Sequence, residues 1–289
     1  MKISLLIAVG LLLLHAAFSV FGPKPREPRF QNQEQQNRYI IERYLAESAR
    51  REVVYVGSSM AARLSTDGGP SCAFNLALHG ESALTGLSVV MLTALRPKQV
   101  FVEINVPERK LNTKLIEKGN SALTRHLSLF AVENMPVNLL FSFVYQLKGS
   151  ATPAFDATLL ANGLTVERDI YANEIAPDLL AANMHMLRNQ VSALEASGTQ
   201  VIFFELPIHP DLEQTPHARQ IRAAFIAVFP IERLITSAEL SRGIKVRTID
   251  GVHLSIDEAR FVSSALQTHH RVACSAPSRT AAGSHAVND

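Results

Sequence analysis

The sequence is poor in the residues that mark several protein classes. It has no tryptophan and only two cysteines, Cys72 and Cys274, in 289 residues, which excludes a scaffold held by several disulfides. Cys72 has the surroundings of a core strand residue and Cys274 lies in the C-terminal tail, so we expect them to stay unpaired. His269 and His270 lack the spacing of metal ligands, and neither a metal site nor a cofactor is expected.

Neither positive nor negative charge is in clear excess. The 28 Lys and Arg residues nearly balance the 26 Asp and Glu residues, and a net charge of +2 gives no electrostatic case for a nucleic-acid partner. No internal repeat is visible. Because 47% of the residues are hydrophobic, the chain can bury one sizeable core, and without its ends it fits one domain of about 200 to 250 residues.

One long apolar run is present, from Ile3 to Phe21, preceded by Lys2 and followed by Lys24 and Arg26. Its length approaches the roughly 20 residues that span a bilayer, whereas its small residues also fit a cleavable secretory signal. We expect residues 1–22 to be a membrane anchor or a signal peptide, with the uncleaved anchor preferred, and the domain to be exported.

The rest of the chain divides by composition. Residues 23–37 are rich in Pro, Arg and Gln and are expected to form a hydrated linker. Residues 38–271 are expected to form the folded domain, beginning with a helix over 38–51. Residues 272–289 are rich in Ala, Ser and small polar residues and are expected to be a disordered tail.

Strand and helix patterns alternate along the domain. Such alternation predicts a parallel, doubly wound sheet in a flavodoxin-like three-layer α/β/α fold, preceded by the N-terminal hydrophobic helix, with sites at the carboxyl ends of the strands. Apolar runs predict strands after residue 53 and over 72–78, 99–105, 200–206 and 245–249. A helix is predicted over 82–95, with apolar residues nearly all round, and helical patterns predict further helices over 176–196, 217–229 and 256–270.

The stretch from Val53 to Arg63 reads as strand, tight turn and helix, with Gly57, Ser58 and Ser59 in the turn. A serine at such a junction lies where unpaired backbone N–H groups favour negative charge, which suits a nucleophile whose attack creates an oxyanion. The alternative is that the turn only caps a helix.

Asp250 and His253 lie three residues apart before the last predicted helix. A serine hydroxyl is a poor nucleophile at neutral pH, and it needs an imidazole base with a carboxylate that fixes the tautomer of the ring. One loop can present both side chains toward the same point. Asp250 and His253 are therefore candidates for that pair.

Four blocks of the sequence, taken in order, resemble the SGNH or GDSL hydrolase superfamily, in its diverged, membrane-anchored bacterial branch. They are residues 57–59, 75–80, 101–106 and 250–253. The resemblance implies that Ser59 is the nucleophile, with Asp250 and His253 completing the catalytic set. It further implies that the Ser59 and Gly80 N–H groups and the Asn105 amide bind the oxyanion.

The chain departs from the family pattern at three positions. Ser58 stands where the family has Asp between Gly and Ser, Glu103 stands in place of the usual Gly two residues before the asparagine, and Val106 stands in place of the usual Asp. The side chains expected near the pocket besides the catalytic set are Ser58, His79, Glu205 and His209. Residues 107–176 are longer than an ordinary connection and form an insertion, either an acceptor-binding or lid segment or a decoration that covers a sheet edge.

The resemblance implies an exported serine esterase or O-acyltransferase that acts on acetyl or other acyl esters of an extracellular polysaccharide through an acyl-Ser59 intermediate. It implies a bacterial envelope location, either anchored in the inner membrane with a periplasmic domain or secreted. A membrane acyltransferase or a polysaccharide synthase is the expected protein partner. Three alternatives stay open: a lipid or small-ester esterase, a non-catalytic glycan-binding or synthase-accessory protein, and a glycosidase that uses Glu103 and Glu205.

Overall fold

The structure is a computed structural model and describes residues 2–66, 72–148 and 156–269. Its centre is a five-stranded parallel sheet in the order β2-β1-β3-β4-β5. This order confirms the predicted flavodoxin-like arrangement. The strands are β1 (Val53–Val56), β2 (Ala73–Asn75), β3 (Gln99–Glu103), β4 (Gln200–Phe204) and β5 (Leu234–Ile235).

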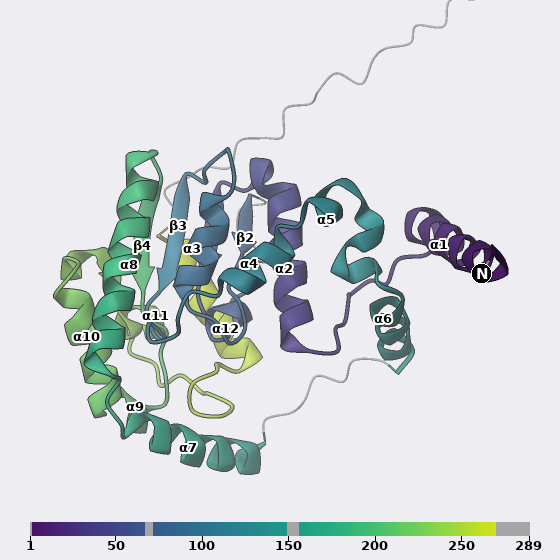
Figure 1. Ribbon diagram of the computed structural model, residues 1–289. Coiled ribbons are helices and arrows are strands. Elements are labelled where there is room, and N and C mark those ends of the chain that lie inside the picture. Colours follow the sequence, from purple (N-terminus) through teal and green to yellow (C-terminus); the bar gives the residue numbers. More distant parts are fainter. Residues whose placement is uncertain (1, 67–71, 149–155, 270–289) are drawn as a thin grey trace, which may run out of the picture.

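Helices cover both faces of the sheet (Figure 1), which gives three layers. Side chains of β1 alternate between two cores: Val54 and Val56 belong to one, and Val53 and Tyr55 to the other. All four are buried, as expected for a parallel sheet covered on both sides. The first core is completed by α2 (Gln33–Glu47), α3 (Ala83–Met91), α4 (Thr113–Gly119), α8 (Pro177–Ala196) and α10 (Pro216–Ile226), and the second by α7 (Ala157–Tyr171), α9 (Pro210–Glu213), α11 (Ser237–Ser241) and α12 (Ile256–Gln267).

The fifth strand differs from the prediction. The expected strand over 245–249 is wrong: this segment forms one isolated antiparallel bridge, Thr248 with Leu254, inside its own loop. The edge strand is instead β5, two residues that pair with Phe203 and Phe204 of β4. A strand of two residues leaves no periodic pattern in the sequence. The bridge between Thr248 and Leu254 instead closes the loop that carries Asp250 and His253.

The helix predicted directly after the first strand also differs from the structure. Residues after Ser59 form a single 3-10 turn, η2 (Ala61–Arg63), and not an α-helix. The leading helix α2 begins at Gln33, inside the predicted linker, because the Asn32 side chain accepts a hydrogen bond from the Gln35 N–H and caps it.

Cys72 precedes β2 and is disulfide-bonded, so the expectation of an unpaired Cys72 is wrong. Its carbonyl accepts the Glu52 N–H at the amino end of the sheet. The chain returns to this end after α12, since Gln99 at the start of β3 donates to the His269 carbonyl. The only other cysteine of the sequence, Cys274, lies outside the described residues, as does the predicted disordered tail.

The insertion consists mainly of helices and 3-10 turns. Its described part holds α4, α5 (Ala122–His126), η3 (Ser128–Phe130), η4 (Val132–Asn134), α6 (Pro136–Lys148) and α7. At the end of the insertion that lies away from the sheet, η3 packs against α1 (Lys2–Phe21) (Figure 1). None of the helices in the described ranges satisfies the length and apolarity required to cross a membrane.

Candidate active site

The turn after β1 is built around Gly57. A Cβ atom at this position would lie 2.4 Å from Glu103 Oε2 and 2.8 Å from the Ala61 Cβ, so only glycine fits. Ser58 is buried with 1% of its surface exposed, while Ser59 is only half-buried. The turn therefore points one serine inward and leaves the next accessible at the carboxyl edge of the sheet.

Glu103, at the end of β3, accepts two hydrogen bonds from this turn. Its Oε2 accepts the Ser58 N–H at 2.6 Å and its Oε1 accepts the Ser58 hydroxyl at 3.1 Å. The Ser58 Oγ in turn accepts the Met60 N–H at 3.1 Å. Burial raises the pKa of Glu103, against the lowering effect of these hydrogen bonds. Two of the three sequence positions that depart from the pattern of the family that the chain resembles, 58 and 103, are thus in direct contact.

The loop after α11 carries the other two predicted catalytic residues. Gly251 has φ +110°, a conformation that glycine adopts without strain. The Asp250 Oδ1 accepts the N–H groups of Val252 at 3.1 Å and His253 at 2.8 Å, and the Ile249 N–H donates to the His253 carbonyl at 2.8 Å. These bonds fold the loop so that aspartate and imidazole lie side by side.

Ser59, His253 and Asp250 form one continuous chain of hydrogen bonds. The His253 Nδ1 lies 2.6 Å from Asp250 Oδ2, and the His253 Nε2 lies 2.9 Å from Ser59 Oγ. An ionised carboxylate only accepts, so Nδ1 carries the ring proton and Nε2 is left to accept from the serine hydroxyl. Residues 194 positions apart in the chain thus meet in the geometry that a serine nucleophile and its base require.

The Asp250 carboxyl is set up to stay ionised. Burial by itself would raise its pKa, but hydrogen bonds from the His253 ring and backbone, the His253 charge and the Val252 N–H outweigh that effect, and the pKa is lowered. The ionised form fixes the imidazole tautomer and stabilises the imidazolium that forms when Ser59 loses its proton.

Two backbone N–H groups are available at this edge. Among the described residues, the N–H groups of Ser59 and Gly80 donate no hydrogen bond. The Gly57 carbonyl accepts the Leu78 N–H at 2.9 Å, which ties the segment before Gly80 to the nucleophile turn. Gly80 has φ +74° and is exposed. Free N–H groups in this position fit the predicted oxyanion donors.

Asn105, the third predicted oxyanion donor, is engaged elsewhere. Its Oδ1 accepts the Leu206 N–H at 2.7 Å, and its Nδ2 donates to the Leu206 carbonyl at 2.9 Å. The side chain is buried and joins the ends of β3 and β4. One amide hydrogen remains, so the oxyanion role of Asn105 stays a prediction beside this structural one.

His79 lies between α2 and the catalytic set. Its backbone N–H and carbonyl are both held by the Asn37 side chain, at 2.8 and 2.7 Å, and its Nε2 lies 3.0 Å from the Gln36 amide. Burial lowers the pKa of His79, and the charges of His253 and Arg63 lower it further. The ring is therefore a neutral neighbour of the catalytic histidine.

A polar cleft of about 330 Å³ adjoins His79 and Gly80. It lies between α2 and α4, and the Gln33 amide stands over Gly80, where a Cβ would meet its Nε2 at 3.0 Å. Most of its lining side chains carry hydrogen-bonding groups: Gln33, Glu34, Asn37, His79, Glu81, Asn112, Lys114 and Lys118. Such a lining suits a hydroxyl-rich ligand better than an acyl chain.

Glu205 and His209 take supporting positions. Glu205 is buried and accepts a hydrogen bond from Arg222 Nε of α10 at 2.7 Å. His209 caps α9 with its ring, and its backbone N–H donates to the Gly251 carbonyl at 2.7 Å. His209 therefore braces the catalytic loop through its main chain, and the sequence offered no signal for that contact.

Helix α7 of the insertion lies directly on the catalytic loop. A Cβ on Gly163 would meet the Asp250 Cβ at 2.6 Å and its Cα at 2.7 Å, and Leu164 packs on Gly251. Burial and the Asp250 charge raise the pKa of Glu167, one turn further along. The sequence predicted an insertion beside the site but gave no sign that this glycine makes the contact.

Comparison with known proteins adds little to this geometry. No family model matches the chain, and no curated protein matches it. One solved structure, described as "a putative platelet activating factor from Streptococcus pneumonia", is 12% identical, with 93% of this chain and 98% of that chain covered, at a TM-score of 0.42.

Proposed function

We propose that the protein is a serine esterase or O-acyltransferase in which Ser59 accepts the acyl group. The observation that carries the proposal is the hydrogen-bond chain from Ser59 through His253 to Asp250, with distances of 2.9 and 2.6 Å. The half-buried position of Ser59 at the carboxyl edge of a parallel sheet supports the same conclusion, since ligands of such folds bind there.

The proposed reaction has two steps. His253 Nε2 takes the proton from Ser59 Oγ as the oxygen attacks an ester carbonyl, and the negative charge on the carbonyl oxygen is stabilised by the N–H groups of Ser59 and Gly80. The imidazolium returns the proton to the leaving alcohol, which leaves an acyl-Ser59. Water or a second alcohol, deprotonated by His253, then takes the acyl group.

Acetyl esters of a polysaccharide are the substrate class that the sequence resemblance implies. The polar cleft beside Gly80 supports a hydroxyl-rich donor or acceptor. Export across the inner membrane and a membrane acyltransferase or synthase partner belong to the same proposal and rest on the sequence alone.

One observation favours a second candidate, a non-catalytic glycan-binding or synthase-accessory protein. The Asn105 amide makes two hydrogen bonds with Leu206, which leaves the third oxyanion donor partly used. The glycosidase alternative loses its support, because Glu103 is buried against Ser58 and Glu205 is paired with Arg222.

Turnover of p-nitrophenyl acetate by the full chain separates the two candidates. The esterase proposal expects acetate release by the wild type and its loss in Ser59→Ala, with Ser264→Ala, at an exposed position of α12, as the control. Equal turnover in the wild type and Ser59→Ala would contradict the proposal. A folded wild type without any turnover or adduct would favour the accessory protein.

A further inference from the structure

Helix α6 exposes an apolar stripe and buries two polar residues, unlike a helix that faces water. Its buried residues are Asn138, Leu139 and Ser142, with 1%, 5% and 2% of their surface exposed. The outward stripe consists of Val137, Leu140, Val144 and Leu147, exposed at 52%, 67%, 39% and 88%. These four positions recur at helical spacing, and a helix on a water-facing surface shows the opposite pattern.

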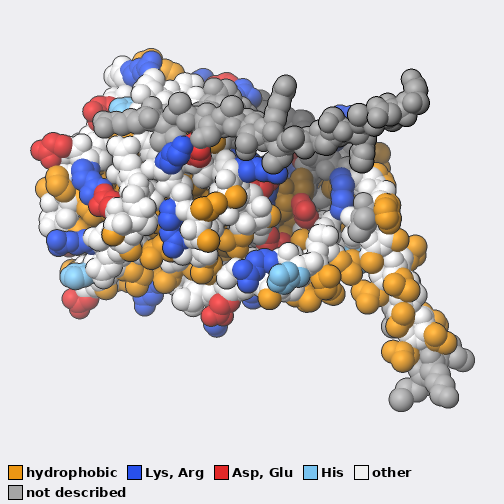
Figure 2. Space-filling view, turned by 90° about the horizontal axis from the view of Figure 1, so that it is seen from above, with side chains coloured by type: hydrophobic (Ala, Val, Ile, Leu, Met, Phe, Trp, Pro, Cys, Tyr) orange, Lys and Arg blue, Asp and Glu red, His pale blue; other side chains and the backbone are white. Residues whose placement is uncertain are grey.

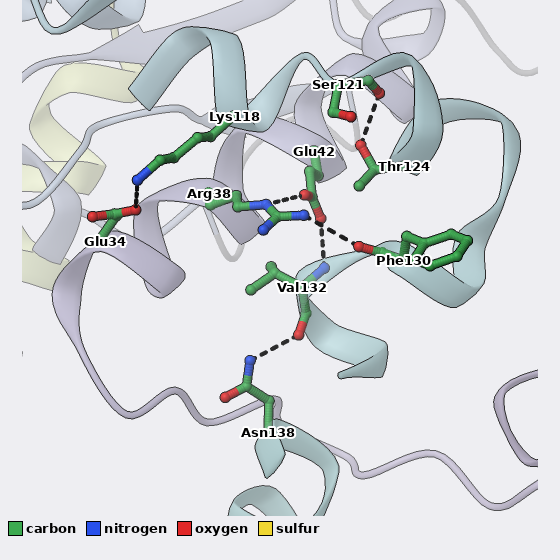
Figure 3. Close-up of polar contacts among 9 residues, drawn as sticks. All are labelled: Glu34, Arg38, Glu42, Lys118, Ser121, Thr124, Phe130, Val132 and Asn138. Carbon is green, nitrogen blue, oxygen red and sulfur yellow. Dashed lines mark hydrogen bonds and ion pairs between the residues drawn. The ribbon is translucent and has the colours of Figure 1, made fainter. Parts of the chain in front are cut away.

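The outward stripe does not result from a loosely docked helix. The Asn138 amide donates to the Val132 carbonyl at 2.8 Å, and Ser142 exchanges hydrogen bonds with the Arg29 backbone. The segment before α6 is bound to α2 by hydrogen bonds. Arg38 and Glu42 of α2 form a partly buried ion pair; Arg38 donates to the Phe130 carbonyl, and Glu42 accepts the Val132 N–H (Figure 3). The stripe is therefore presented outward by a hydrogen-bonded interface, in which only the Asn138 Oδ1 lacks a partner.

The N-terminal helix extends this apolar surface on the same side of the domain. It packs against η3, and the chain leaving it runs along α6, where the Arg26 N–H donates to Gln146 Oε1 at 3.3 Å. Hydrophobic side chains lie along the face of the projecting helix that is seen in Figure 2. Its exposed residues include Leu6, Leu14 and Phe21, at 71%, 68% and 86%.

The charges at this surface have one dominant sign. No acidic residue occurs in the sequence before Glu27, and Glu27 is paired with Arg29. The only charged residue of α6 is Lys148. In the chain that leaves α1, Arg26 is exposed next to α6, and Lys24, also exposed, donates from its Nζ to the Asn134 Oδ1 at 2.6 Å. Cations around an apolar stripe match an anionic lipid surface, whereas a two-fold contact with a second copy would bring these like charges together.

We propose that the outward stripe of α6, together with the adjoining α1, lies on the surface of an anionic lipid bilayer. The stripe enters the headgroup and acyl boundary, and Arg26 and Lys148 contact lipid phosphates. The arrangement keeps the domain at a fixed orientation on the membrane, beyond what a tether at α1 alone would give.

The absence of tryptophan gives a direct test. Leu147→Trp places a single fluorophore at the most exposed position of the stripe in the full chain. On vesicles of phosphatidylcholine and phosphatidylglycerol, its emission should shift to the blue and be quenched by brominated lipid. The matched control is Ile226→Trp on α10, 54% exposed, which should bind the same vesicles without a shift or quenching.

A second variant changes the surface itself. Leu140→Asp/Val144→Asp alters only exposed positions and should lower vesicle partition by about tenfold or more, because it removes buried apolar area and adds anionic charge. An unquenched Leu147→Trp on vesicles that carry the protein would overturn the proposal. A blue shift in buffer alone that grows with protein concentration would also overturn it, in favour of a second copy on the stripe.

Discussion

Glu103 and Ser58 are joined by two hydrogen bonds, from the Ser58 N–H at 2.6 Å and from its hydroxyl at 3.1 Å. The carboxylate comes from the central strand β3 and the serine from the turn after β1, which places a buried acid directly under the nucleophile. The family that the sequence resembles has its carboxylate at position 58 and glycine at position 103. Two of the three departures therefore form one compensated exchange in this chain.

The exchange predicts strong coupling between the two positions. Glu103→Gly leaves the Ser58 N–H buried without a partner, which should cost about 1–3 kcal/mol of the free energy of unfolding and lower kcat/KM of the esterase. Ser58→Asp alone places two carboxylates in contact and should also be harmful. The double variant Ser58→Asp/Glu103→Gly should exceed both single variants in activity and stability, because the new carboxylate can accept the N–H groups of its own turn.

Chemical denaturation and p-nitrophenyl acetate kinetics on the four proteins give the coupling free energy. Additive losses, with the double variant the worst of the set, would show that Glu103 and Ser58 act independently.

Helix α7 predicts a second dependence, on the lack of a side chain at Gly163. A methyl group there would meet Asp250 at 2.6–2.9 Å, so Gly163→Ala must displace either α7 or the catalytic loop. Misplacement of a catalytic group by about 1 Å can cost on the order of 100-fold in rate, and we expect kcat to fall at least tenfold. Circular dichroism should show an unchanged fold.

The control for this variant is Asn162→Ala, at the exposed neighbouring position of α7. It should leave kcat within about twofold of the wild type, as surface substitutions usually do. Equal activity of Gly163→Ala and Asn162→Ala would mean that α7 does not set the position of Asp250.

The lowered pKa of Asp250 predicts how stability changes with pH. A carboxyl whose pKa is lower in the folded than in the unfolded state adds stability above its unfolded pKa, near 4, and this contribution is lost as the pH falls through the folded pKa. Asp250→Asn should therefore be less stable than the wild type at pH 7. The difference in the free energy of unfolding should shrink below about pH 4.

Denaturant unfolding of the wild type and Asp250→Asn across this pH range measures the difference. A gap that stays constant down to pH 2 would contradict a lowered pKa and assign the loss to packing alone.

The sheet could be predicted from the sequence because four of its strands are apolar runs with helical patterns between them. β5 could not, since two residues carry no period. The end of α2 nearest the linker was missed because its first turns are polar, and only the Asn32 cap marks it. Asp250 and His253 were predicted as a pair from their spacing, and the resemblance to the SGNH superfamily implied Ser59 as the nucleophile; the structure brings the three together.

The contacts that support this set are tertiary and left no local signal. Gly163 is one glycine in a helix, and its meaning appears only when α7 lies on Asp250. The contact between Glu103 and Ser58 was visible in the sequence only as two unexplained departures from a motif. The exposed apolar stripe of α6 likewise depends on knowing which side of the helix meets the linker and η4.

The most direct test of the account is the mass of the full chain after reaction with p-nitrophenyl acetate at short times, followed by peptide mapping. The account predicts one acetyl group on Ser59, absent in Ser59→Ala and retained in Ser264→Ala, with slower formation in His253→Ala. An acetyl group on another residue, or an equal adduct in Ser59→Ala, would contradict Ser59 as the acyl-accepting nucleophile.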